Sequence, residues 1–275
     1  MDFDTYYTKE QEAFRTEVCA WLDENAPVGL NIPADGAALD QETQHILKAF
    51  RRKLGRKGWL APSWPVEIGG AGLDPDIAVV IREELGHLRL PPVGDNRRWI
   101  NAVLVWGTEE QKRRYILPAL RGEVISWQAF GEAGGGADIA GIKTRAVAEG
   151  DQFVVSGIKA FITGPMDPDY LLTLAVTAPE RPLRRNLGIL MIDAGLPGIT
   201  IHAPKLLVGS ERTIYLNDVH VPADCLIGGI YMGWEIAQTI LQQERGEMAF
   251  RPDDRQLITS VLEYLREERR SQGTG

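Results

Sequence analysis

A glycine-rich stretch in the middle of the chain has the clearest capacity for ligand chemistry. The apolar run SWQAF at residues 126–130 passes directly into GEAGGGAD at residues 131–138. This order predicts a strand that ends in a loop whose backbone amides are not shielded by side chains. Such amides can lie against a flat or anionic ligand, although the same pattern is also typical of an ordinary turn. The spacing fits neither G-x-G-x-x-G nor the P-loop, so a Rossmann-type dinucleotide site is not indicated.

Metal chemistry is not indicated either. The two cysteines, Cys19 and Cys225, have no metal-like spacing and are expected to be inert. The histidines are scattered and form no H-E-x-x-H pair. They are His45, His87, His202 and His220.

The elements before this loop are predicted to be helices, which form an N-terminal domain over residues 1–122. Apolar residues recur at helical intervals between clear start and stop signals. Residues 58–73 carry too many Gly, Pro and Trp to continue a helix and are expected to form a long ordered loop. The signals are capping boxes at Thr8/Gln11 and Thr108/Gln111, a cap at Asp74 before Pro75, and stops near Asn25, Gly58, Gly107 and Pro118.

Residues 123–230 change to a β pattern and are expected to form a mainly antiparallel barrel or sandwich, because no helical segment separates the strands. Residues 231–275 return to a helical pattern, with one helix from Trp234 and another around 258–265. The predicted fold class is therefore α+β. The expected strands are 124–130, 143–148, 153–163, 170–177, 187–193 and 213–219.

Composition restricts the class of partner. The chain of 275 residues is 44% hydrophobic and carries a formal net charge of −8. That charge argues against nucleic acid and anionic membrane, which require a basic face. No apolar run approaches the ~20 residues of a membrane span. The N-terminus lacks the pattern of a signal peptide, so a cytoplasmic location is expected.

The order of these segments, together with several short motifs, resembles the acyl-CoA dehydrogenase family from about Thr8 to Arg245, and most closely its bacterial branch for steroid and long acyl chains. That branch reads approximately W-C-Q-G-F-S-E-P-G-A-G-S-D where this chain has WQAFGEAGGGAD. The other matches, in chain order, are the Trp64-Pro65 loop with its glycines, GTEEQ at 107–111, KAFIT at 159–163, LNDVHVP at 216–222, and the span from Gly233-Trp234 to Glu244-Arg245.

The resemblance implies FAD as cofactor and α,β-dehydrogenation of an acyl-CoA thioester, with an electron-transfer flavoprotein or similar protein as acceptor. Residues 128–137 match the segment whose amides bind the flavin, where negative charge accumulates on reduction. Phe161 matches the aromatic residue on the ring, and Thr163 the hydroxyl near its reactive nitrogen. The cofactor-binding residues implied are Gln128, Phe130, Gly131, Gly136, Phe161 and Thr163.

The resemblance also implies a catalytic base at Glu244, in the E-R position of the helix from Trp234. A carboxylate desolvated there has a raised pKa suited to α-proton abstraction. The alternative is that Glu244 is a solvated helix residue or pairs with an arginine, since another branch carries its base much further along the chain. Ala137, where the family has Ser, and Arg245 match substrate-binding positions.

Several departures favour dependence on a partner chain. Gly131 replaces a hydroxyl residue, which predicts a lost hydrogen bond, and Ala133 replaces a stiffening Pro. Family members have a long C-terminal helical bundle, whereas only about 40 residues follow here, so a homo- or hetero-oligomer is expected. The alternatives to an enzyme subunit are a non-catalytic scaffold that completes a partner's FAD site, or a flavin-dependent oxidase or monooxygenase relative.

Overall fold

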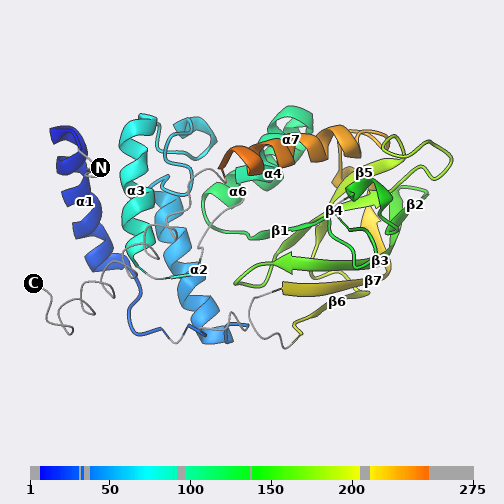
Figure 1. Ribbon diagram of the computed structural model, residues 1–275, viewed down its shortest axis with the longest axis horizontal. Helices are drawn as coiled ribbons and strands as arrows, with labels where there is room; N and C mark the ends of the chain where they lie inside the picture. The colour runs from blue at the N-terminus through cyan, green and yellow to red at the C-terminus, as the bar shows by residue number, and fades with distance from the viewer. Residues whose placement is uncertain are drawn as a thin grey trace, which may run out of the picture.

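The computed structural model describes residues 7–30, 32–33, 38–88, 90–91, 97–136, 138–204 and 211–247. Helices make up one end of the molecule and a sheet the other, with α7 lying beside the sheet (Figure 1). The helices are α1 (Lys9–Asn25), α2 (Gln41–Arg56), α3 (Pro75–His87), α4 (Arg97–Trp106), α5 (Glu109–Gln111), α6 (Leu117–Leu120) and α7 (Gly233–Glu247). The strands are β1 (Ser126–Ala129), β2 (Arg145–Glu149), β3 (Gln152–Thr163), β4 (Tyr170–Val176), β5 (Leu187–Asp193), β6 (Ile199–His202), β7 (Glu211–Pro222) and β8 (Leu226–Ile227).

The predicted helix signals are confirmed for α1, α2 and α3. The Thr8 hydroxyl accepts a hydrogen bond from the Gln11 amide at 3.1 Å, while the Gln11 side-chain oxygen accepts one from the Thr8 amide at 2.8 Å. Asp74 caps α3, which begins at Pro75. Gly58 follows the end of α2 with φ +70°, a left-handed conformation in which glycine carries no steric penalty.

The prediction that Pro118 limits the fifth helix is wrong. After α5 the chain continues through a π-helical turn at Lys112–Ile116 and then through α6, and Pro118 lies in the first turn of α6. A proline is tolerated there because the wider π-helical turn before it does not require a hydrogen bond from the proline nitrogen. The wider turn also leaves space for the proline ring. Helix α6 ends at Leu120 with Arg121 as its C-cap, and Gly122 follows with φ +72°.

The strands form one sheet of order β6-β7-β3-β2-β4-β5-β8, with β1 attached to β4. The predicted antiparallel character is confirmed for most pairs; β1 runs parallel to β4, and β2 meets β4 in parallel at one residue pair. The six predicted strands are present; β5 has the predicted bounds, and the other five have shifted ends. The sequence pattern missed β6 and β8 because each is short and lies directly beside a turn or a 3₁₀ segment.

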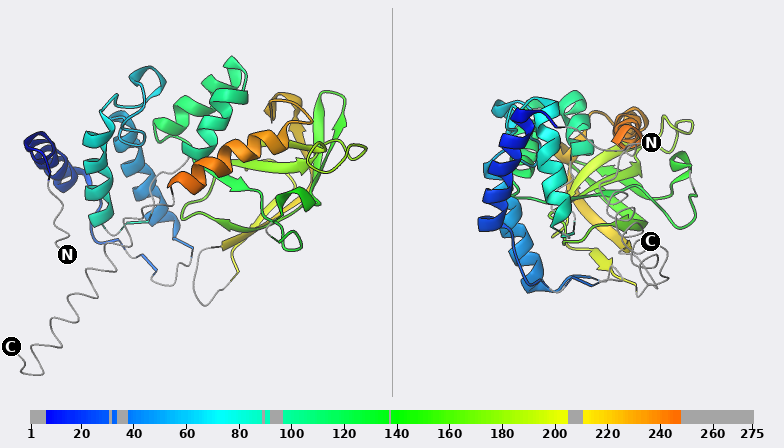
Figure 2. Two further views of the ribbon diagram at one scale, coloured as in Figure 1. Left: turned by 45° about the horizontal axis from the view of Figure 1, so that its top comes forward. Right: turned by 60° about the vertical axis from the view of Figure 1, so that its left-hand side comes forward.

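One face of the sheet is covered by helices. Buried side chains of α4, α6 and α7 share a core with those of β4 and β5, including Ile100, Leu120, Leu174, Ile189 and Ile236. Helix α7 crosses beside the sheet in both further views (Figure 2). A separate core joins α1, α2 and α3, in which the rings of Trp21 and Trp59 lie 4.9 Å apart.

Helix α2 crosses the end of α6 at very close range. A Cβ at Gly55 would lie 2.2 Å from the carbonyl carbon and oxygen of Arg121, and Gly122 approaches the Arg51 carbonyl in the same way. The buried Arg51 then donates from Nη2 to the carbonyls of Ala119 and Val124, each at 3.0 Å. The strand that leads to the glycine loop is thereby tied to α2.

Substitution of Gly55 by alanine tests this contact. Alanine favours a helix interior by about 1 kcal/mol over glycine. Here the added methyl group meets backbone that cannot turn away, which costs about 1–3 kcal/mol or more. We expect a net fall in the free energy of unfolding, measured by urea denaturation. Lys53→Ala, at an exposed position of the same helix, is the control; equal stability of the two variants would contradict the close crossing.

Candidate functional site

A buried ion pair fixes the glycine loop to strand β3. The Lys159 ammonium lies 2.9 Å from Glu132 Oε1, and the side chains are 0% and 8% exposed, respectively. Glu132 also accepts hydrogen bonds from the Thr144 hydroxyl at 2.6 Å and from the amides of Thr144 and Lys143 at 2.9 and 2.7 Å. The Lys159 ammonium donates a further bond to the Phe130 carbonyl at 3.4 Å. These contacts fix the loop at its beginning and at the residues that follow it.

The surroundings of Lys159 and Glu132 shift the pKa of each side chain. Burial lowers the pKa of Lys159 to about 8, and the nearby Glu132 carboxylate only partly offsets this effect. Burial alone would raise the pKa of Glu132. The Lys159 ammonium and the hydrogen bonds from Thr144 and Lys143 outweigh burial, so the pKa of Glu132 is lowered. Both groups are therefore charged at neutral pH.

Gly131 allows the loop to lie against β3. Its carbonyl accepts a hydrogen bond from the Ala160 amide at 2.9 Å. A Cβ at Gly131 would lie 2.6 Å from the Ala160 carbonyl oxygen, so this backbone has no space for a side chain. Gly131 was expected to represent only a lost hydrogen bond; the structure adds a steric reason for glycine at this position.

The tip of the loop is open. A Cβ at Gly134 or Gly136 would meet no protein atom within 4 Å, and Gly136 has φ +57°. Among residues 131–136 of this loop, the amides with no acceptor in the described part of the chain are those of Gly131, Glu132, Ala133, Gly134 and Gly136. At Gly134 and Gly136 the surroundings are also open, so these two amides can donate hydrogen bonds to acceptor atoms of a ligand.

Phe161 lies next to this open loop in an unusual conformation. It is 65% exposed, and its φ of +59° places a bulky residue in the left-handed region. The pairing of β3 with β7 shifts register between Lys159 and Ile162, so a bulge directs Phe161 outward while both of these neighbours stay buried. An exposed aromatic ring held in strained backbone is typical of a functional position.

The remaining predicted site residues differ in how far their side chains are exposed. Gln128 is half-buried in β1, and Thr163 is exposed at the end of β3. The Phe130 side chain is only 4% exposed and belongs to the core, so any contact of Phe130 with a ligand is through its backbone. Ala137 lies outside the described residues. Glu244 and Arg245 fall near the end of α7, where only the backbone is described.

Three residues of the site were not identified from the sequence as site residues: Lys159, Glu132 and Thr144. A signal exists for Lys159, because it continues the alternation of the inward-facing Phe153 and Val155 along β3. A lysine at an inward position of a strand requires a buried partner. Its partner, 27 residues earlier, could not be chosen from the pattern.

Taken together, the described residues form a platform for a flat ligand. Phe161 offers a ring face, and the loop amides offer donors for acceptors along one edge of the ligand. Within the described ranges, no group of three or more His, Cys, Asp and Glu side chains could hold a metal ion. Among the described helices, none has the length and apolar character needed to cross a bilayer.

Comparison with known domains covers most of the chain. Residues 8–123 match the N-terminal domain of acyl-CoA dehydrogenases, and residues 128–219 match their middle domain. The acyl-CoA dehydrogenase FadE29 of Mycobacterium tuberculosis is 33% identical over 201 residues, which are 72% of this chain and 52% of the relative. FadE34 of the same organism is 30% identical over 78% of this chain and 30% of the relative. The chain thus spans about half, or less, of the length of these relatives.

Solved structures show the same architecture. The Tcur3481-Tcur3483 steroid ACAD superposes with a TM-score of 0.80 at 27% identity, over 96% of this chain and 69% of that one. The ChsE4-ChsE5 complex of Mycobacterium tuberculosis superposes with a TM-score of 0.69 at 24% identity, over 88% of this chain and 61% of that one. The second likeness supports the fold alone.

Substitution of Lys159 by methionine tests the buried pair. Methionine keeps most of the side-chain volume but leaves Glu132 buried without its cation, a change that costs about 3–5 kcal/mol. We expect Lys159→Met to lower the free energy of unfolding by that amount. The double variant with Glu132→Gln should lose less than the sum of the two single variants, as measured by urea denaturation. Additive losses would show that the two side chains do not interact.

Proposed function

Because this chain belongs to the acyl-CoA dehydrogenase family, we propose that it binds FAD at the glycine loop and Phe161, and that it takes part in the α,β-dehydrogenation of a CoA thioester. The observation that carries the proposal is the platform itself, an exposed aromatic ring in left-handed backbone beside unpaired loop amides. This arrangement suits a flat heteroaromatic ring that has acceptor atoms along one edge.

Each part of the platform has a role in this proposal. Phe161 would pack on the ring, and Thr163, exposed two residues later, would donate its hydroxyl. The unpaired amides of this loop, such as those of Gly134 and Gly136, and the polar side chain of Gln128 would hold the edge where negative charge develops on reduction. When bound, FAD supplies the acceptor for a hydride from the acyl chain.

We propose that Glu244 is the base that removes the α-proton of the substrate. The residue belongs to the span from Gly233-Trp234 to Glu244-Arg245 on α7, which packs against α4 and β5. Placed at the site, its carboxylate would accept the proton from the α-carbon while the hydride leaves the β-carbon. Arg245 and Ala137 would contact the thioester substrate.

The substrate we propose is a bulky CoA thioester such as a steroid side chain. Support comes from the likeness to a structure described as a steroid ACAD, at 27% identity. An electron-transfer flavoprotein or a similar protein would reoxidise the flavin. We further propose that the chain works in a homo- or hetero-oligomer, since the similar steroid ACAD at 27% identity is named by two components, Tcur3481 and Tcur3483.

A non-catalytic scaffold subunit is the alternative. The flavin platform lies entirely within residues 128–163, whereas the proposed base is on a different element, α7. A chain that supplies only the platform would complete a partner's FAD site without carrying out proton transfer. An oxidase or monooxygenase would differ from both in consuming oxygen rather than reducing a protein acceptor.

Substitution of Phe161 by glycine separates ligand binding from stability. Loss of the ring should weaken FAD binding by the assembled protein at least about tenfold, because a large aromatic contact is removed. Stability should change little, since relief of about 1–3 kcal/mol of strain offsets the flexibility that glycine adds. Fluorescence titration with FAD and urea denaturation measure the two quantities. Ile158→Ala, at another exposed position of β3, is the control and should bind FAD as the wild type does. Equal FAD affinity in the two variants would contradict a role for the Phe161 ring in FAD binding.

Substitution of Glu244 by glutamine distinguishes the enzyme from the scaffold. Glutamine keeps the shape of the side chain but accepts no proton, so FAD binding should survive while substrate-driven bleaching of the flavin slows by on the order of 10² to 10⁴. The measurement is anaerobic rapid mixing of the assembled complex with a CoA thioester that reduces the wild-type flavin. Glu235→Gln, at an exposed position on the same helix, is the control. Bleaching of the Glu244→Gln variant at the wild-type rate would favour the scaffold.

A further inference from the structure

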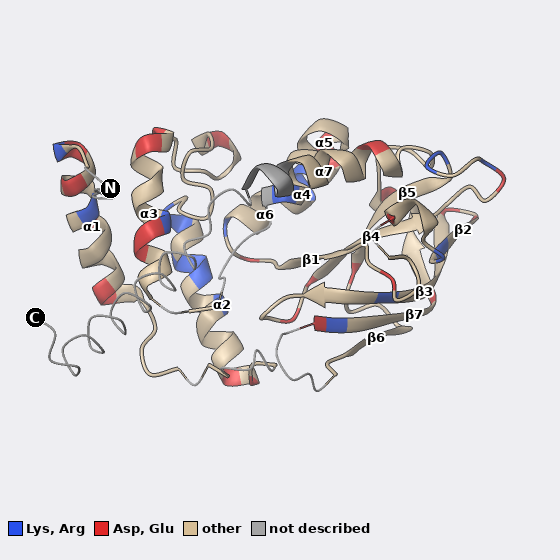
Figure 3. Ribbon diagram, viewed as in Figure 1, with Lys and Arg blue, Asp and Glu red and all other residues tan. Residues whose placement is uncertain are grey.

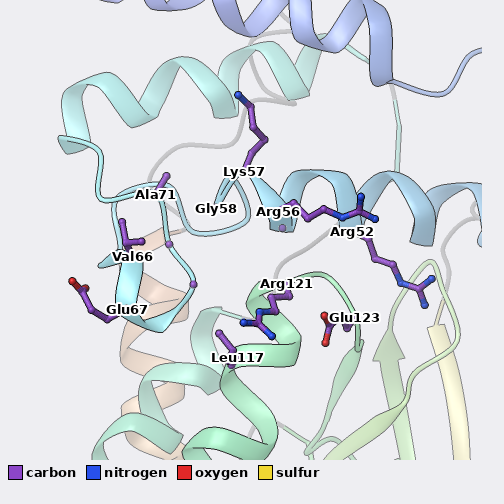
Figure 4. A pocket seen from close by; sticks show the side chains of 13 residues that line it. Arg52, Arg56, Lys57, Gly58, Val66, Glu67, Ala71, Leu117, Arg121 and Glu123 are labelled. Atoms are coloured by element: carbon purple, nitrogen blue, oxygen red, sulfur yellow. The ribbon is translucent and has the colours of Figure 1, made fainter.

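A cavity separate from the glycine loop lies between the end of α2, the 58–73 loop and the end of α6 (Figure 4). Its volume is about 740 Å³, within the range of about 300–1,000 Å³ typical of small-molecule sites. None of its lining residues belongs to the flavin platform at residues 128–163. It is therefore a candidate for a second ligand.

The cavity carries excess positive charge on a chain of net charge −8. Four cations line it, Arg52, Arg56, Lys57 and Arg121, against two carboxylates, Glu67 and Glu123. Figure 3 shows Lys and Arg residues in blue along this part of the α2 ribbon. All four cations are at exposed positions, where water screens their mutual repulsion, and a bound anion would relieve what repulsion remains.

The three arginines are not neutralised by protein groups. Within the described part of the chain, Arg52, Arg56 and Arg121 form no ion pair. Lys57 is partly engaged, since its ammonium lies 3.8 Å from Glu17 and 5.0 Å from the centre of the Trp59 ring. The guanidinium groups of the three arginines are therefore available to a ligand.

Stabilisation of helix ends does not account for all of these charges. Arg56 lies in the last turn of α2 and Arg121 is the C-cap of α6, where cations favourably meet exposed carbonyls. Arg52 lies one turn earlier and has no such role. The close contact of Gly55 with the Arg121 backbone brings the two basic helix ends together at this cavity.

Recognition at this cavity depends on side chains rather than on backbone amides. The amides of Gly58 and Gly70 already donate to the carbonyls of Gly55 and Pro65, at 3.0 Å each. The glycines instead keep the walls free of bulk, because a Cβ at Gly58 would lie 2.6 Å from Gly70. In Figure 4, Glu123 lies between Arg121 and Arg52, so carboxylate and guanidinium groups face the same space.

We propose that this cavity binds a small phosphate ester that also carries hydroxyl groups. Guanidinium groups match a phosphate in geometry and charge, often through two parallel hydrogen bonds. Glu67 and Glu123 can only accept hydrogen bonds, so they suit ligand hydroxyls rather than a second anion. A sugar phosphate has both kinds of group.

The test uses ribose 5-phosphate as the probe and isothermal titration of the full chain at low ionic strength. We expect saturable binding to the wild type. Binding should fall by about 100-fold in Arg52→Gln/Arg121→Gln, because each guanidinium that contacts an anion contributes roughly tenfold. The matched control is Arg145→Gln/Arg185→Gln, which removes the same charge from exposed positions outside the cavity and should bind as the wild type does.

Three results would overturn the proposal. They are no binding at millimolar concentration, an equal loss in the control variant, and undiminished binding in Arg52→Gln/Arg121→Gln. Inorganic phosphate should bind at least tenfold more weakly than ribose 5-phosphate, since it has no sugar hydroxyl groups that could donate hydrogen bonds to the two glutamates. Equal binding of the two probes would remove the hydroxyl part of the assignment. Thermal unfolding of each variant confirms that it is folded, and none of these readouts depends on the flavin.

Discussion

The buried pair between Lys159 and Glu132 is the interaction on which the candidate flavin site depends. It joins the first turn of a glycine-rich loop, which has few side chains of its own to pack, to the longest pairing in the sheet. A loop of this composition would otherwise lose considerable conformational entropy on ordering. Burial lowers the pKa of the lysine to about 8, and the charge is tolerated because the carboxylate and the Phe130 carbonyl receive its hydrogen bonds.

The same strand that supplies the buried lysine also supplies the exposed aromatic residue. Regular alternation along β3 would keep Lys159 and Phe161 on the same face, and the bulge before Ile162 breaks that alternation. One residue of irregularity therefore permits a buried anchor and a solvent-facing ring two positions apart. The left-handed backbone of Phe161 is the strained part of this arrangement, and the pairing of β3 with β7 on both sides maintains it.

The two proposed ligand sites differ in the interactions that they offer. At the glycine loop, neutral amides and a ring face suit a flat group whose charge develops during reaction, and no basic side chain faces solvent among Gly131 to Gly136. At the cavity beside α2, fixed guanidinium charges suit a group that is already anionic. The close crossing of α2 and α6 connects the two sites mechanically, because Arg51 bonds to the carbonyl of Val124 just before β1.

The sequence by itself predicted most of the order of helices and strands, although not β6 and β8, because most elements depend on local periodicity and caps. The Thr8 and Thr108 capping boxes, the Asp74 cap and the alternation in β3 could all be recognised in the sequence. It also singled out the glycine loop and Phe161 as candidate site residues, since short motifs are contiguous in the chain. It could not place Pro118 correctly, because a π-helical turn has no composition of its own. Only the tertiary structure decided that Lys159 pairs with Glu132, that Gly131 excludes a side chain, and that Arg52 and Arg121 share a cavity. Those facts are distances between residues far apart in sequence, and packing rather than local propensity sets them.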